Sequence, residues 1–308
     1  MAEALLEPTE DVELARHDLA VHGYCVVSGA LDETTVKSMR DRLVEQSLGE
    51  SVNGVRADQD PESSSYVGGA GLRARDNRRV WNLVNKGTVF EALLRRSTVL
   101  ELVGSVLGNP FLLSGIQANF VAPGDDPLPL HSDQGYVARP WPPYAMTASV
   151  IWMLHSFTEE NGATTVVPGS HIEASAVSPD EMLARARLLR RGGIPVCAPA
   201  GSALVFDGRI VHGTGRNSTE ADRLGVLTYF CRPFLRQQEN FSLSVAPRVL
   251  AGLSDEVKQL LGFSVWKALG SVEGVGAEGS IVDRPARPVE ALDRHGRPCR
   301  DAAFATAD

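Results

Sequence analysis

Short apolar segments with a two-residue period fill the sequence from residue 111 onward, and they restrict the fold more than any other feature. Successive side chains of a strand point to opposite faces, so this alternation predicts strands. Gly and Pro turns separate the segments, and strands this short favour an antiparallel barrel or jelly roll over a parallel sheet. The predicted strands lie within residues 111–121, 145–157, 163–167, 203–211 and 225–231.

Helices are predicted ahead of this β region. Residues 12–19 show apolar side chains at helical spacing before a short predicted strand at 22–27, and Asp32 can cap a second helix. Thr88 and Thr98 are each followed three residues later by Glu, the pattern of a capping box, which predicts two more helix starts.

One domain is expected over residues 1–308, mainly β with flanking helices. Its predicted parts are a mostly helical region over 1–110, a β core over 111–235, and a C-terminal helix and tail over 236–308. Within the core, a Ser-Pro-Asp-Glu start and a Gly-Gly stop predict one helical insert at 178–191.

Charge and composition exclude several classes of partner. The chain has 30 basic and 38 acidic side chains, a net charge of −8, so nothing attracts a nucleic acid at long range. We see no apolar run long enough to span a membrane and no signal-peptide pattern, and therefore expect a cytoplasmic protein. The four cysteines are far apart without a Cys-x-x-Cys pair, which indicates reduced, packing thiols.

A candidate pair of metal ligands, His131 and Asp133, follows the first predicted strand of the core. Residues two apart in extended backbone point to the same side, so the two side chains can hold one ion. The pair alone is weak, because such pairs arise by chance, and His171 with Glu173 forms another. We expect His171 to stabilise a reverse turn, since Pro-Gly-Ser precedes it.

His212 supplies the third candidate ligand. The Asp207-Gly208 dipeptide between two apolar runs predicts a tight hairpin, with His212 on a strand paired with its predecessor. Two imidazoles and one carboxylate on one face of an octahedron form the facial triad of non-haem iron(II) oxygenases, which leaves open positions for a cosubstrate and dioxygen. Zinc prefers a closed tetrahedral set or three ligands with water.

Arg223 begins a predicted buried strand 11 residues after His212. A buried guanidinium needs an anionic partner, and its planar fork suits a carboxylate. A dicarboxylate that chelates the metal at one end and meets Arg223 at the other satisfies both requirements. Arg216 is the alternative anion-binding residue, because it is closer to His212 in the sequence.

Further short elements accompany these residues in a fixed order. They are Gly23-Tyr24-Cys25-Val26-Val27, Gln134, Glu160-Asn161-Gly162-Ala163-Thr164, Val167-Pro168-Gly169-Ser170-His171, Gly201-Ser202 and Gly213. With the metal-ligand candidates and Arg223, they make the stretch from about residue 10 to 235 resemble the phytanoyl-CoA dioxygenase family of iron(II)/2-oxoglutarate-dependent oxygenases.

The resemblance implies a cupin-like, double-stranded β-helix (jelly-roll) core and a full set of cofactors. It implies that His131, Asp133 and His212 hold Fe(II) and act catalytically. 2-Oxoglutarate is then bound by Arg223 with Thr164 and Gln117, dioxygen is the second cosubstrate, and ascorbate can support turnover. Several relatives carry Gln three residues before the first metal histidine, where this chain has Leu128, so one cosubstrate contact differs.

Candidate substrate contacts follow from position. Asn119 shares a strand face with Gln117, an uncommon pair for a core strand. Tyr136 and Trp141 follow the metal pair, although Trp141 can equally stiffen the loop. His155 lies on a strand face with apolar neighbours, either as a core histidine or lining a pocket. Weaker candidates for the pocket rim are Arg78, Arg79 and Trp81.

Two stretches, 49–71 and 271–308, lack the periodicity of packed elements. We expect the first, which contains Tyr66 and several glycines, to close over the site when substrate binds.

The leading hypothesis is a dioxygenase that oxidises a small, largely apolar organic molecule in secondary metabolism by hydroxylation, desaturation or ring formation. The alternatives are a non-catalytic metal- or ligand-binding barrel, a cupin-type zinc or manganese isomerase, and an acyl-CoA hydroxylase. An oligomer is compatible with the sequence.

Overall fold

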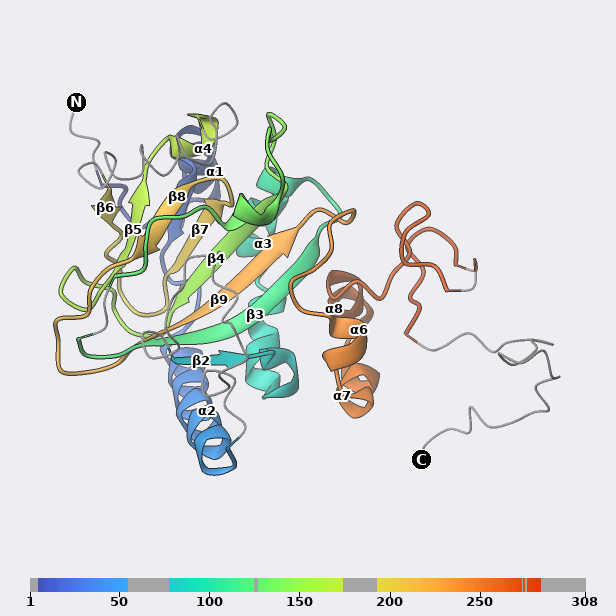
Figure 1. Ribbon diagram of the computed structural model, residues 1–308, viewed down its shortest axis with the longest axis horizontal. Helices are drawn as coiled ribbons and strands as arrows, with labels where there is room; N and C mark the ends of the chain where they lie inside the picture. Colours follow the sequence, from blue (N-terminus) through green and yellow to red (C-terminus); the bar gives the residue numbers. More distant parts are fainter. Residues whose placement is uncertain are drawn as a thin grey trace.

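Two antiparallel sheets form the centre of the molecule. The computed structural model describes residues 5–54, 78–124, 127–173, 193–272, 274 and 276–283. Within these residues, the larger sheet has the order β1-β7-β4-β9-β3-β2 and the smaller has β6-β5-β8 (Figure 1). The strands are β1 (Tyr24–Val27), β2 (Arg78–Trp81), β3 (Leu112–Val121), β4 (Thr147–Met153), β5 (Thr164–Val167), β6 (Ile194–Pro195), β7 (Ala203–Asp207), β8 (Val211–Thr214) and β9 (Arg223–Cys231).

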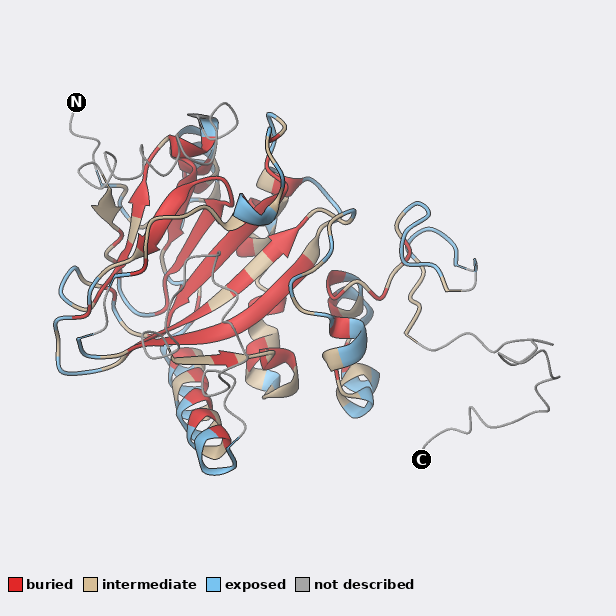
Figure 2. Ribbon diagram, in the orientation of Figure 1, coloured by how far each residue is buried: buried red, intermediate tan, exposed pale blue. Residues whose placement is uncertain are grey.

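The inner faces of the two sheets pack against each other. Ile151, Leu204 and Phe206 of the larger sheet form one buried cluster with Ala163 and Val166 at the smaller one. Figure 2 shows the long strands of the larger sheet as almost continuously buried. The predicted fold class is therefore confirmed: the protein is mainly β, with flanking helices around a jelly-roll core.

Helices cover the outer face of the larger sheet. Trp152, Val205 and Val226, which alternate with the inward-facing residues, belong to the cluster that includes the apolar faces of α1 and α3 (Figure 1). The described helices are α1 (Val12–His22), α2 (Glu33–Val52), η2 (Leu83–Asn85), η3 (Thr88–Leu94), α3 (Ser97–Leu107), η4 (Asp133–Tyr136), α4 (Ser170–Glu173), α6 (Phe241–Ser244), α7 (Pro247–Gly252) and α8 (Asp255–Leu260). None of the described helices is long and apolar enough to cross a membrane.

Local capping signals were accurate for some helices and misleading for others. Asp32 caps α2 as predicted, by accepting a hydrogen bond from Thr35 N. Thr88 and Thr98 do not cap: η3 follows Gly87, α3 follows Arg96, and neither helix has a side-chain cap. The predicted helical insert at 178–191 lies outside the described residues.

The turn that leads to His212 is not the predicted hairpin. β7 lies in the larger sheet, whereas β8 pairs with β5 in the smaller one. Gly208 makes a close approach to the first residue of β4, because a Cβ atom there would lie 1.9 Å from Thr147 Oγ1. The Asp207-Gly208 signal therefore marks a crossing between sheets and not a two-residue hairpin. Neither residue has the positive φ that a type I′ turn, the form favoured by Asp-Gly, requires.

Candidate active site

Three side chains meet at one end of the space between the sheets. His131 Nε2 and His212 Nε2 each lie 3.6 Å from Asp133 Oδ1. One ligand atom from each residue can be chosen so that all lie within 4.8 Å of one another, which is the size of a metal-binding group. The structure therefore brings together the three ligands predicted from the sequence, and two imidazoles with one carboxylate suit Fe(II) with open positions.

Backbone pairing sets the two histidines side by side. His131 N donates to His212 O at 2.8 Å, and His212 N donates to His131 O at 2.9 Å. The two Nδ1 atoms face backbone carbonyls, Pro129 O at 2.9 Å and Ile210 O at 3.2 Å. Donation from Nδ1–H leaves each Nε2 with the lone pair that a metal needs.

Asp133 is oriented by a strand of the larger sheet. Ser149, on the inner face of β4, donates from Oγ to Asp133 Oδ2 at 2.5 Å. Oδ1 is left facing the two imidazoles. Burial alone would raise the pKa of Asp133, but His212, His131 and the Ser149 hydroxyl together hold that pKa at about 2.

The pKa values of the two imidazoles are shifted in opposite directions. Burial lowers the pKa of His212 to about 4, so this ring is neutral near pH 7. Burial also acts against protonation of His131, but the hydrogen bond and charge of Asp133 outweigh it and raise the pKa of His131. Of the three candidate ligands, His131 is thus the one whose protonation competes most with metal binding as the pH falls.

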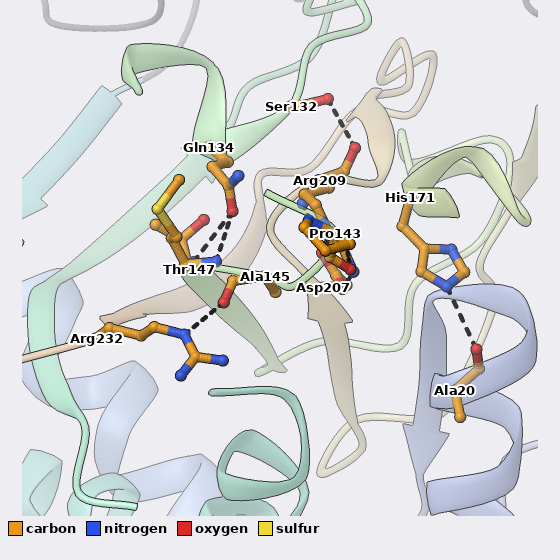
Figure 3. A network of polar contacts seen from close by, with 11 residues as sticks. Ala20, Ser132, Gln134, Pro143, Ala145, Thr147, His171, Asp207, Arg209 and Arg232 are labelled. Carbon is orange, nitrogen blue, oxygen red and sulfur yellow. Dashed lines mark hydrogen bonds and ion pairs between the residues drawn. The ribbon is translucent and has the colours of Figure 1, made fainter. Parts of the chain in front are cut away.

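Polar contacts fix the segment that carries His131 and Asp133 (Figure 3). Ser132 Oγ donates to Arg209 O at 2.9 Å, and Gln134 Oε1 accepts from Met146 N at 2.8 Å and Thr147 N at 3.3 Å. The residue before Asp133 is therefore tied to the turn after β7, and the residue after it is tied to the start of β4.

A buried ion pair anchors the crossing that leads to His212. Arg209 donates to both carboxylate oxygens of Asp207, at 3.0 and 2.7 Å, and to Pro143 O at 3.0 Å (Figure 3). His171 lies apart from the metal group, with Nε2 3.4 Å from Ala20 O of α1. This position agrees with its predicted structural role.

Arg223 is a buried cation that has no carboxylate partner among the described residues. Its residue is 4% exposed, its guanidinium carbon lies 4.0 Å from the ring centre of Phe157, and Nε has no hydrogen-bond partner. Burial lowers the pKa of Arg223 to about 9. The guanidinium forms no ion pair with any described residue. Arg216, the alternative, is exposed. A buried, unpaired guanidinium in the barrel interior fits the far carboxylate of a dicarboxylate cosubstrate.

The other expected cosubstrate contacts lie in the same interior. Thr164 is buried on β5 and shares its face with Val166 of the inner cluster. Gln117 and Asn119 are buried on the inner face of β3, and an amide oxygen of each lacks a partner. Arg79 lies opposite Asn119 on β2, close enough for its charge to act against protonation of His131.

A cavity of about 470 Å³ lies at the β2–β3 edge. Tyr136, a predicted substrate contact in the same helical turn as Asp133, lines it. Trp141 is buried and donates from Nε1 to Val137 O at 2.8 Å, which supports its alternative role of stiffening the loop. His155 Nδ1 accepts from Leu224 N at 3.2 Å, so it supports the start of the strand that carries Arg223. Tyr66, with nearly all of the expected closing segment 49–71, lies outside the described residues.

Sequence reasoning missed the residue that orients Asp133. Ser149 is paired with Tyr229 across β4 and β9, and both lie in runs whose apolar neighbours indicate only buried strands. Alternation puts Ser149 on the same face as Ile151, which is the one signal that could have found it.

The family relationship is clear from the sequence as a whole. A family model for phytanoyl-CoA dioxygenase matches residues 19–225. The chain belongs to the phytanoyl-CoA dioxygenase family. A dioxygenase of Aspergillus fumigatus, af480, is 30% identical over 266 residues, which cover 83% of this chain and 78% of that protein.

Solved structures agree with this family fold. The crystal structure of HygX from Streptomyces hygroscopicus, with nickel, 2-oxoglutarate and hygromycin B bound, matches with a TM-score of 0.56 and 20% identity. The match covers 73% of this chain and 88% of the HygX chain. SnoK, an α-ketoglutarate-dependent carbocyclase from nogalamycin biosynthesis, also matches with a TM-score of 0.56 at 20% identity, over 76% and 91% of the two chains.

Membership of the phytanoyl-CoA dioxygenase family settles the type of enzyme. The chain is a non-haem iron, 2-oxoglutarate-dependent dioxygenase, and its cofactors are Fe(II) and 2-oxoglutarate. The cluster of His131, Asp133 and His212 provides the donor set that Fe(II) needs in such an enzyme.

Proposed function

We propose that this enzyme oxidises a small, largely apolar organic molecule in secondary metabolism, by hydroxylation, desaturation or ring formation. His131, Asp133 and His212 would hold Fe(II), and Arg223 with Thr164 would bind the far carboxylate of 2-oxoglutarate. The observation that carries the assignment is the guanidinium of Arg223, which is buried in the same interior as the three ligands and has no ion-pair partner in the part of the chain that the structure describes.

Each protein group has a defined task in this proposal. Bound Fe(II) and 2-oxoglutarate together activate dioxygen for oxidation of a C–H bond, with succinate and carbon dioxide as coproducts. In the neutral imidazoles, the carbonyls of Pro129 and Ile210 accept from Nδ1–H and so select the tautomer whose Nε2 is free for the metal. Ser149 keeps Asp133 Oδ1 turned toward the imidazoles. Arg223 supplies two-point recognition of a carboxylate where water is excluded.

The relatives support a role in secondary metabolism. Those with a described activity include fungal dioxygenases, among them af480 of Aspergillus fumigatus, FrzG of Cladobotryum and FUM3 of Gibberella moniliformis. SnoK and SnoN come from nogalamycin biosynthesis. The cavity at the β2–β3 edge is lined largely by aromatic and aliphatic side chains, which fits a mostly apolar substrate.

The complete set of ligands and Arg223 separates this proposal from its alternatives. A non-catalytic barrel has no need to keep three metal ligands and a buried anion-binding residue. A cupin-type isomerase has no use for Arg223.

Two measurements test the proposal. Anaerobic titration of the Fe(II)-loaded enzyme with 2-oxoglutarate should give a metal-to-ligand charge-transfer band. A succinate-release screen over ring-containing natural products and acyl-CoA esters should then show coupled turnover with a ring compound. Absence of the band would contradict the cosubstrate site, and coupled turnover with acyl-CoA esters alone would contradict the substrate class.

A further inference from the structure

The cavity at the β2–β3 edge is lined by neighbours of the residues that hold Asp133. Tyr229, in its wall, is paired across β9 and β4 with Ser149, the residue that binds Asp133. Tyr136, which also lines it, lies in the same helical turn as Asp133. A molecule in this cavity therefore lies against the strand and the helical turn that position the Asp133 carboxylate.

The deep end of the cavity contains an acceptor that no described protein group satisfies. Gln117 is 1% exposed, and its Nε2 lies 3.3 Å from Tyr229 Oη. Its Oε1 is buried without a hydrogen-bond partner among the residues that the structure describes. A buried, unpaired amide oxygen destabilises a protein unless a ligand completes its hydrogen bonding. 2-Oxoglutarate presents only acceptors near neutral pH, so the natural partner of this atom is a donor on the substrate.

The outer end of the cavity is built by the segment that follows β9. Glu239 N donates to Ser114 O at 2.8 Å, and Gln238 N donates to Ser114 Oγ at 3.0 Å. Gln237 Nε2 donates to Leu113 O and Leu261 O, which leaves that amide no free donor. The segment is therefore fixed to β3, and its walls are preformed before any ligand binds.

Glu239 is the carboxylate of this outer end. Its side chain lines the cavity, is half-buried, and forms no ion pair with any described residue. Arg236 also lines the cavity, but it is exposed and pairs with no described carboxylate. Trp81, which is paired with Gln117 across β2 and β3, and Tyr136 add aromatic faces to the cavity.

We propose that this cavity is the substrate subsite and that it selects a ring compound with hydrogen-bond donors at both ends. An N–H or O–H group near the reacting carbon donates to Gln117 Oε1, and a protonated amine at the other end pairs with Glu239. The ring packs between Trp81 and Tyr136. This inference rests on the proposed function and names the substrate class for the same iron site. It also assigns Gln117 to the substrate and not to 2-oxoglutarate.

Three indole probes test both ends of the subsite on the anaerobic Fe(II)- and 2-oxoglutarate-loaded enzyme. Tryptamine has the ring N–H and the ammonium group, 1-methyltryptamine lacks the N–H, and indole-3-acetate replaces the ammonium by a carboxylate. Isothermal titration should show tryptamine binding about tenfold or more tighter than either analogue. Equal affinities, or no binding of tryptamine, would overturn the inference.

Substitutions then assign each end. Gln117→Leu should abolish the preference for tryptamine over 1-methyltryptamine, and Glu239→Gln should abolish the preference over indole-3-acetate. Glu220→Gln, which removes the same charge at an exposed site outside the cavity, should leave both preferences intact. Gln117→Leu should retain the melting temperature, because it removes a buried unpaired oxygen.

The charge-transfer titration separates this inference from the proposed function. If Gln117→Leu weakened the binding of 2-oxoglutarate and left the preference for tryptamine over 1-methyltryptamine unchanged, Gln117 would be a cosubstrate contact. The subsite inference would then fail. The proposed function would stand in that case. Loss of the band in the wild-type enzyme would contradict the proposed function itself.

Discussion

Ser149 Oγ donates a 2.5 Å hydrogen bond to Asp133 Oδ2, and this bond leaves Oδ1 equidistant from the Nε2 atoms of His131 and His212, at 3.6 Å from each. The bond links the metal-binding loop to the inner face of the larger sheet. It explains how a carboxylate outside any strand has a fixed orientation.

Ser149→Ala should weaken metal binding by about 10- to 100-fold, because the carboxylate loses the group that orients it. Titration of the metal-free protein with Fe(II) under anaerobic conditions measures the change. Ser105→Ala, on α3, is the matched control and should bind Fe(II) like the wild type. Unchanged affinity in Ser149→Ala would show that the hydrogen bond does not position the ligand.

Asp133→Ala should abolish turnover. The carboxylate supplies the only negative charge among the three proposed protein ligands, so the ion should bind more weakly or gain an open coordination position. Succinate release and substrate oxidation should both fall to background in Fe(II)-supplemented assays, while circular dichroism stays that of the wild type. Substantial oxygenase activity in the iron-loaded variant would remove Asp133 from the metal sphere.

Metal binding should release a proton from His131. The pKa of His131 is raised by Asp133, whereas His212 has a pKa of about 4 and Asp133 of about 2, so the latter two are already deprotonated near pH 7. Metal affinity should therefore rise with pH up to the pKa of His131 and level off above it. Calorimetry in buffers of different ionisation enthalpy should count close to one proton per metal below that pKa. Release of two protons near pH 7 would contradict this assignment.

Breaking the buried pair of Asp207 and Arg209 should destabilise the fold strongly. Their side chains are only 6% and 10% exposed, so Asp207→Ala leaves a buried guanidinium unpaired, at a cost of about 3–5 kcal/mol. Urea denaturation measures the free energy of unfolding. Asp41→Ala breaks the exposed pair with Lys37 and should change stability by no more than about 1 kcal/mol. Similar effects of the two substitutions would show that the buried pair contributes little.

The strands and the metal ligands were predictable because their signals are local. Alternation of apolar residues places β3, β4, β5, β7 and β9, and it correctly puts Gln117 and Asn119 on one face. The spacing of His131 and Asp133 alone was weak; together with a later histidine on a strand and the ordered motifs around them, it predicted that the three meet.

Sheet membership and ligand support were not predictable, because they depend on residues distant in sequence. The Asp207-Gly208 pair has the composition of a hairpin turn, but its geometry is set by contact with Thr147 on another strand. The hydrogen bond between Ser149 and Asp133 joins residues 16 positions apart, and no feature of either residue marks it.

The 2-oxoglutarate affinities of Arg223→Ala and Arg216→Ala test the central claim most directly, measured by charge-transfer absorbance of the anaerobic Fe(II) enzymes. Arg223→Ala should bind 2-oxoglutarate about one to two powers of ten more weakly, with little change in melting temperature, because it loses charge-assisted bonds to one carboxylate. Arg216→Ala should bind like the wild type. Equal effects of the two substitutions, or a larger effect of Arg216→Ala, would contradict the placement of 2-oxoglutarate between the metal group and Arg223.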